Sequence, residues 1–162
     1  MNLYIGKDKH LVRLCPKTMI DEKSGDFLTS AFHLKIKYGK LEKYLSCDLS
    51  DFHNKDSLFK NIAISIDKII NDYFQYKGNK NIEKKKKIHR NINYFAVLDT
   101  TSILNKNDSY AKPIDSIKQT QINESHSGIY FNKNNQQIVA MILAEIANKN
   151  RNKFKNIDLT IL

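Results

Sequence analysis

Two residues far apart in the chain, Arg13 and His126, have the side-chain chemistry to bind and act on a phosphate group. Imidazole titrates near neutral pH, and a guanidinium stabilises negative charge on a reacting phosphate. A metal-independent ribonuclease needs such groups as general base, general acid and cation. His126 stands in NESHSGIY (123–130), at a loop-to-strand junction where a side chain can project into a cleft. The alternative is that His126 and its serine neighbours only satisfy backbone groups.

Arg13 belongs to HLVRLC (10–15), an apolar run with the character of a strand that Pro16 ends. Side chains alternate along a strand, so His10 and Arg13 point to opposite faces and cannot readily share one site. Arg13 falls on the core-like face, where a guanidinium needs a partner. That partner is either a bound anion or an acidic side chain in a structural salt bridge. The acidic candidates are Asp48, Asp99 and Glu124.

A run of positive charge interrupts the middle of the chain, in the very polar segment 76–91. Its principal cations are Lys84, Lys85, Lys86, Lys87 and Arg90. Such a run either contacts a nucleic-acid backbone without regard to sequence or forms a solvated loop.

The whole chain has 162 residues and a formal net charge of +10, which favours a polyanionic partner. A/T-rich codons could supply many of the lysines, and only three arginines are present, so the charge alone is a weak argument for nucleic acid. The chain has no P-loop, dinucleotide-binding, zinc-protease or serine-hydrolase motif. We therefore expect no cofactor and no metal site.

Composition also bears on the compartment. No apolar run approaches the ~18 residues that cross a bilayer, and the N-terminus does not resemble a secretion signal. The two cysteines, Cys15 and Cys47, share no close spacing. These features predict a cytoplasmic protein with reduced thiols and no membrane partner.

The elements that must position these residues follow from hydrophobic periodicity. Strands are predicted over 10–15, 31–37, 43–49, 94–100, 126–131 and 157–162, with 31–37 and 43–49 forming a hairpin and 94–100 lying centrally. Helices are predicted over 56–77 and 136–149. The chain is thus expected to form one α+β domain over 1–162, with a mainly antiparallel sheet of five or six strands and two principal helices.

Several short segments, taken in order, resemble a family of small bacterial proteins of uncharacterised role. They are VRLCP (12–16), TSAFHL (29–34), YLSCDL (44–49), FAVLDT (95–100) and NESHSGIYF (123–131). The family shows an early arginine, a short S-A-F segment, an L-S strand and a late S-H dipeptide that enters a strand. The resemblance brings no activity, but it implies that Arg13, Ser30, Ser46 and His126 gather in one place.

Two functions follow as expectations. In the first, the protein binds nucleic acid, RNA in particular, with or without cleaving it. Arg13 and His126 would contact a phosphate, with Ser30 and Ser46 as hydrogen-bonding neighbours, and the lysine run would hold the backbone. In the second, it is a non-catalytic interaction module or accessory subunit whose basic surface meets an acidic protein. A phosphate-bearing small molecule, such as a nucleotide signal, would fit the same anion site.

Overall fold

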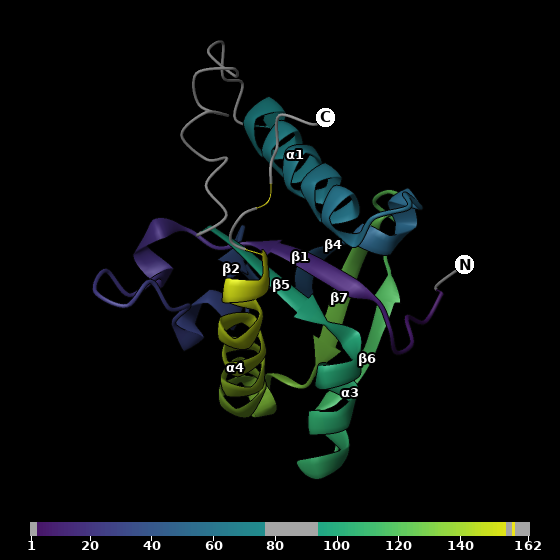
Figure 1. Ribbon diagram of the computed structural model, residues 1–162. Coiled ribbons are helices and arrows are strands. Elements are labelled where there is room, and N and C mark those ends of the chain that lie inside the picture. Colours follow the sequence, from purple (N-terminus) through teal and green to yellow (C-terminus); the bar gives the residue numbers. More distant parts are fainter. Residues whose placement is uncertain (1–2, 77–93, 155–156, 158–162) are drawn as a thin grey trace.

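The computed structural model describes residues 3–76, 94–154 and 157 (Figure 1). Three α-helices are defined within these residues: α1 (Leu58–Tyr76), α3 (Thr100–Ser109) and α4 (Gln136–Phe154). The main sheet contains β1 (His10–Leu14), β4 (Leu45–Leu49), β5 (Phe95–Asp99), β6 (Ile114–Gln119) and β7 (His126–Phe131). None of the described helices is long and apolar enough to span a membrane.

The five strands follow the order β5-β1-β4-β7-β6, and every neighbouring pair is antiparallel. Strand β1 pairs with β5 along its whole length, from His10 to Leu14. With β4 it pairs only through Leu11 and Val12. The two strands therefore separate after Val12, in the middle of the sheet.

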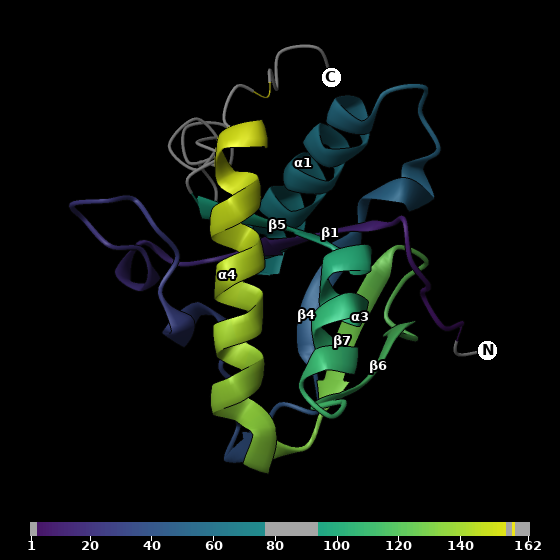
Figure 2. The ribbon, with the colours of Figure 1, turned by 60° about the horizontal axis from the view of Figure 1, so that its bottom comes forward.

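Helices cover the sheet on both sides: α1 lies on one face, and α3 and α4 lie on the other (Figures 1 and 2). Val12, Asp48 and His126 stand opposite one another in adjacent strands, so they share the α1 face. The apolar part of that face packs against Ile62, Ile66 and Ile70 of α1. The other face forms the larger core beneath α4. Leu11, Cys47, Ile129, Val139 and Leu143 are among its members.

A second, two-stranded sheet projects beside the main one. It consists of β2 (Ile36–Lys37) and β3 (Lys40–Leu41). The turn between them uses Gly39 with φ at 74°, a conformation that glycine adopts without steric cost. We refer to residues 35–42 as the short hairpin.

The predicted fold class is confirmed: the structure is α+β, with a five-stranded antiparallel sheet. It also contains strand β6 and helix α3, both of which the sequence prediction left out. Asp99 caps this helix, accepting a hydrogen bond of 2.9 Å from the backbone N–H of Ser102.

Two details of the prediction are wrong. Residues 31–37 do not form a hairpin with 43–49, because 29–32 make a 3-10 turn and β4 pairs with β1 and β7 instead. Strand β5 lies at the edge of the sheet, not at its centre. It is apolar because both of its faces are covered: Val97 belongs to the α1 core and Leu98 to the α4 core. The strand predicted over 157–162 lies outside the described residues except for residue 157.

Candidate functional site

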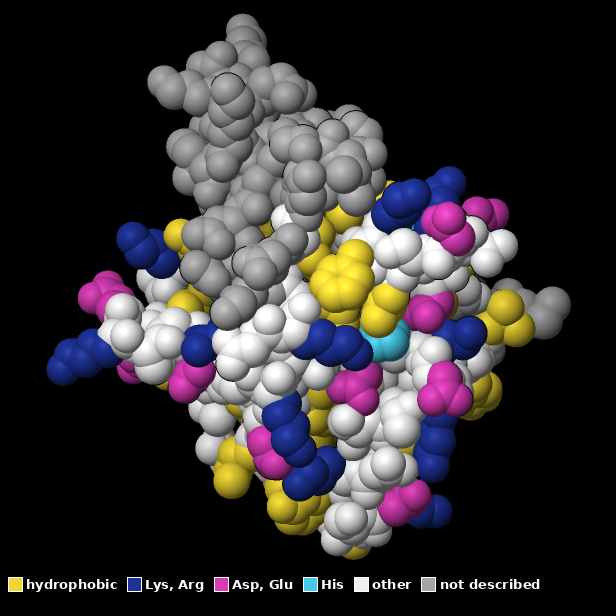
Figure 3. Space-filling view, viewed as in Figure 1, with side chains coloured by type: hydrophobic (Ala, Val, Ile, Leu, Met, Phe, Trp, Pro, Cys, Tyr) yellow, Lys and Arg dark blue, Asp and Glu magenta, His cyan; other side chains and the backbone are white. Residues whose placement is uncertain are grey.

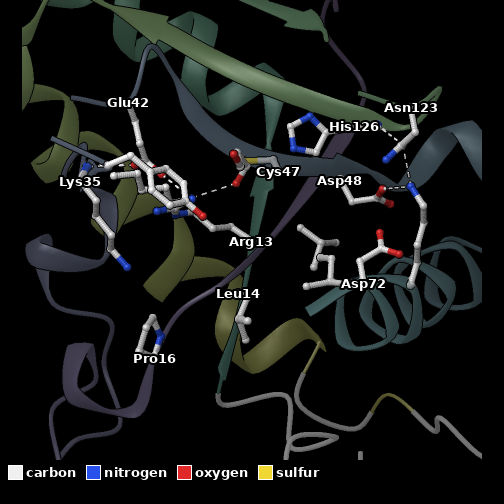
Figure 4. A pocket seen from close by; sticks show the side chains of 16 residues that line it. Arg13, Leu14, Pro16, Lys35, Glu42, Cys47, Asp48, Asp72, Asn123 and His126 are labelled. Atoms are coloured by element: carbon white, nitrogen blue, oxygen red, sulfur yellow. Dashed lines mark hydrogen bonds and ion pairs between the residues drawn. The ribbon is translucent and has the colours of Figure 1, made fainter. Parts of the chain in front are cut away.

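A cavity of about 890 Å³ lies where β1 and β4 separate (Figure 4). β1 and β4 contribute residues at and beyond their last pair, and α1, the short hairpin and the loop before β7 complete the lining. Figure 4 shows Arg13 and Lys35 towards one end and His126 and Asn123 towards the other. The cavity thus has two chemically different ends.

Arg13 occupies the gap between the separating strands. Its side chain donates from Nε to the carbonyl oxygen of Ala31 at 3.1 Å and from Nη1 to that of Ser46 at 2.9 Å. The residue is only 8% exposed. Among the described residues, no carboxylate forms an ion pair with it. Its direct hydrogen-bond partners are therefore backbone carbonyls, and the alternative of a structural salt bridge to Asp48, Asp99 or Glu124 is not realised.

The short hairpin brings further charges to the same end. Burial lowers the pKa of Lys35, and the positive charge of Arg13 lowers it further. Glu42 lies on the cavity wall as well, but its carboxylate is engaged by the hairpin itself. It accepts 2.9 Å contacts from the Lys35 backbone N–H and the Lys37 ammonium. Burial would raise the pKa of Glu42, but the hydrogen bonds from Lys35 and Lys37 and the positive charges of Lys37 and Arg13 outweigh it, so that the pKa is lowered. Arg13 and Lys35 consequently give this end an excess of positive charge.

The other end is built around the buried carboxylate of Asp48. Its Oδ1 accepts hydrogen bonds from Ser125 Oγ at 2.6 Å and from Lys68 Nζ at 3.2 Å. Its Oδ2 accepts one from Ser65 Oγ at 2.6 Å and lies 3.0 Å from His53 Nε2. Lys68 Nζ also donates to Ser125 Oγ. The Asp48 charge is therefore fully compensated inside the protein.

Lys68 reaches one residue further. Its Nζ donates to Asn123 Oδ1 at 2.7 Å, and the same oxygen accepts from the backbone N–H of His126 at 2.9 Å. The ammonium group thereby ties α1 to the loop that precedes β7. This loop is what sets the position of His126 at the cavity wall.

His126 is half-buried, and its Nδ1 lies 2.5 Å from Thr120 Oγ1. Burial lowers the pKa of His126, and the positive charge of Lys68 lowers it further. The imidazole is therefore mostly neutral at pH 7. A neutral imidazole can accept a proton or a hydrogen bond from a ligand in the cavity.

The structure brings three of the predicted site residues, Arg13, Ser46 and His126, to the wall of one cavity. Ser46 contributes through its backbone carbonyl, which holds Arg13. Ser30 does not line the cavity, although the next residue, Ala31, also holds Arg13. The predicted lysine run falls outside the described residues. It comprises Lys84, Lys85, Lys86, Lys87 and Arg90.

The other described histidines are placed elsewhere. His10 packs edge-on against Phe154, with 6.2 Å between the ring centroids. His53 is engaged with Asp48, and His33 is not part of the cavity lining. His126 is thus the one histidine on this wall among the described residues. In the same part of the chain, no group of three His, Cys, Asp or Glu side chains is placed to hold a metal ion.

Sequence reasoning missed the polar residues that α1 supplies. Asn61, Ser65, Lys68 and Asp72 recur at spacings of three and four, which puts them on one stripe of the helix beside its apolar face. Such a stripe on a helix that otherwise packs on a sheet signals buried polar contacts. It could have indicated Lys68 and, through it, the Asp48 end of the cavity.

Comparison with protein-family models, with curated proteins and with solved structures gives no match. The family resemblance noted in the sequence stays a prediction. The functional argument rests on the geometry of the cavity.

Proposed function

We propose that this protein binds nucleic acid, RNA in particular, by holding a phosphate group in the cavity beside Arg13. The observation that carries the proposal is the buried Arg13 guanidinium, which faces the cavity with no ion-paired carboxylate among the described residues. A buried charge is costly unless it is compensated, and its two carbonyl partners leave the net charge in place. A phosphate oxygen would supply the missing charge and bond to the remaining N–H groups.

Lys35 supports the same assignment, because its ammonium adds a second cation close enough to Arg13 to be repelled by it. Two cations held together in a concave site favour an anion between them. The surface seen in Figure 3 differs: lysine and arginine side chains are interspersed there with acidic ones. The cavity is therefore a better phosphate site than that face. RNA as the ligand also agrees with the cytoplasmic location expected from the sequence.

Cleavage of the bound strand is a secondary part of the proposal. His126, neutral at pH 7, could serve as the base, but the cavity wall supplies no second imidazole among the described residues to act as the acid. Incubating labelled RNA with wild type and with His126→Ala, in the presence of EDTA, tests this step. Equal cleavage by both proteins would remove His126 from the reaction.

The binding proposal is tested by fluorescence anisotropy with a labelled RNA of about 12 nucleotides. Arg13→Met is compared with Arg151→Met, a matched control whose guanidinium instead pairs with Asp26 at 2.9 Å. We expect Arg13→Met to weaken binding about tenfold or more, and Arg151→Met to leave it nearly unchanged. Wild-type binding should also weaken steeply between about 50 and about 200 mM salt. Equal affinities for the two variants would contradict the assignment of Arg13.

A further inference from the structure

A row of rings and one cation extends from the cavity along the sheet. The ring centroids of His126 and Tyr44 lie 6.0 Å apart, and those of Tyr44 and Tyr130 lie 4.8 Å apart. Lys118 Nζ stands 4.5 Å from the centroid of Tyr130 and 6.0 Å from that of Tyr4. We name these five residues the aromatic row. His126 belongs to both the row and the cavity wall, so the two features are continuous.

The row lies on the sheet face that α1 covers only in part. Ser46 stands opposite Gly128, and Gly128 stands opposite Lys118, which places all three on the face of Asp48 and His126. Helix α1 packs against β1 and β4 on this face. Further across the sheet, Tyr44, Tyr130 and Lys118 are half-buried, and Tyr4 is 76% exposed. Solvent thus reaches the row over its length.

Gly128 allows the rings to lie close to the sheet. A Cβ atom at this position would stand 2.6 Å from Cδ2 of Tyr44 and 2.9 Å from Cε2 of Tyr130. Any larger residue would therefore push both rings away from the strand. The absence of a side chain here fixes where the two tyrosines can pack.

We infer that the aromatic row binds the bases of single-stranded RNA whose phosphate is held at Arg13. This inference rests on the proposed function and specifies its ligand as an unpaired strand. Aromatic rings stack on any base, and a neighbouring lysine attracts the backbone between bases. A duplex hides the faces of its bases, so rings on an open sheet face favour a single strand. The positive charge of Lys118 is complementary to the negatively charged backbone of such a strand.

The test uses two labelled strands of equal length, about 12 nucleotides each. One is an ordinary oligoribonucleotide, and the other is an abasic strand that keeps the sugars and phosphates but has no bases. Wild type should bind the ordinary strand at least about tenfold more tightly than the abasic strand, because only the ordinary strand has bases that can stack on the rings. Tyr130→Leu and Tyr4→Ala should each weaken ordinary-strand binding severalfold and leave abasic-strand binding unchanged. Tyr110→Leu, at a tyrosine that is 46% exposed and outside the row, is the matched control and should behave as wild type.

The outcomes separate the inference from the proposed function. Suppose that Arg13→Met weakens the binding of both strands, while the tyrosine variants either leave the binding of both unchanged or weaken both equally. The base-binding role of the aromatic row is then overturned, and the phosphate site stands. Equal affinity of the wild-type protein for the two strands also overturns the base-binding role of the aromatic row. If neither strand binds, both proposals fail. Because Tyr4 is largely exposed, Tyr4→Ala keeps the test valid even if Tyr130→Leu proves unstable by thermal unfolding.

Discussion

Arg13 donates a hydrogen bond of 2.9 Å from Nη1 to the backbone carbonyl of Ser46 in the neighbouring strand. The bond lies just beyond the last pair between β1 and β4, at Val12 and Asp48. A strand that loses its neighbour leaves carbonyl groups unpaired, and a buried unpaired carbonyl costs free energy. Here a side chain supplies the donor that the missing strand pair would have supplied. The same separation that opens the cavity therefore also fixes the cation on its wall.

Replacing Arg13 with Met should lower the free energy of unfolding by about 2 kcal/mol, because the carbonyls of Ala31 and Ser46 both lose a charged donor. Removing a buried charge offsets part of that loss. Urea denaturation followed by circular dichroism measures the change. Arg151→Met, which breaks a more exposed pair, should cost at most about 1 kcal/mol. An unchanged unfolding midpoint for Arg13→Met would show that the two carbonyls are satisfied in another way.

Replacing Asp48 with Asn should be more damaging, by about 2–4 kcal/mol. The substitution leaves Lys68 without its carboxylate, and an amide nitrogen takes the place of an oxygen that accepts hydrogen bonds. Chemical denaturation of Asp48→Asn beside Asp115→Asn, at an exposed position on β6, measures the difference. Similar losses for the two variants would mean that the Asp48 hydrogen bonds contribute little to stability.

Much of the fold could be predicted because α1 has apolar residues at spacings of three and four, α4 is apolar almost all round, and β1 and β7 are short apolar runs. The hairpin over 31–49 failed for a reason that the local pattern does not contain. Leu34 is buried as alternation requires, but its backbone N–H bonds the side chain of Gln136 on α4, and Ile36 is 74% exposed. Pairing with distant segments decided the structure there. Helix α3 was missed because its sequence is mostly polar, although the capping Asp99 was a readable signal.

Residues of the candidate site could be predicted only where a polar or charged residue stands in an otherwise apolar segment of the sequence. Arg13 in an apolar strand was such a case, and strand alternation correctly separated it from His10. Lys35 gave no comparable signal, since a lysine next to a turn is ordinary. Lys68 belongs to the site because its ammonium donates to the side chain of Ser125, which is distant in the chain. Only the fold brings these two residues together.

Replacing Gly128 with Ala should destabilise the protein by about 1–3 kcal/mol, because the new methyl group would overlap the rings of Tyr44 and Tyr130. Thermal unfolding measures the loss, and near-ultraviolet circular dichroism reports whether the tyrosine environment changes. Gly6→Ala is the control, because a Cβ there meets nothing within 4 Å. If both alanine variants unfold at the wild-type temperature, the rings do not pack tightly on Gly128.

The stability of the protein should fall as the pH drops below the ordinary histidine value of 6.5, in part because of His126. Burial lowers the pKa of this residue in the folded protein, and the charge of Lys68 lowers it further. The unfolded chain therefore takes up the proton first. The contribution of His126 to stability is complete above pH 6.5 and is lost as the pH falls towards the lowered pKa, with a slope of at most about 1.4 kcal/mol per pH unit. His126→Asn should flatten this part of the stability profile.

Nuclear magnetic resonance of the imidazole protons reports the same effect directly: His126 should titrate below 6.5 in wild type. In Lys68→Met the midpoint should move upward, because the repelling ammonium is gone and the attraction of Asp48 remains. Lys60→Met, on the same helix but paired with Asp56 at 3.6 Å, should leave the midpoint in place. A His126 midpoint at or above 6.5 in wild type would contradict the lowered pKa, and the cavity wall would then lack the neutral proton acceptor assigned to it.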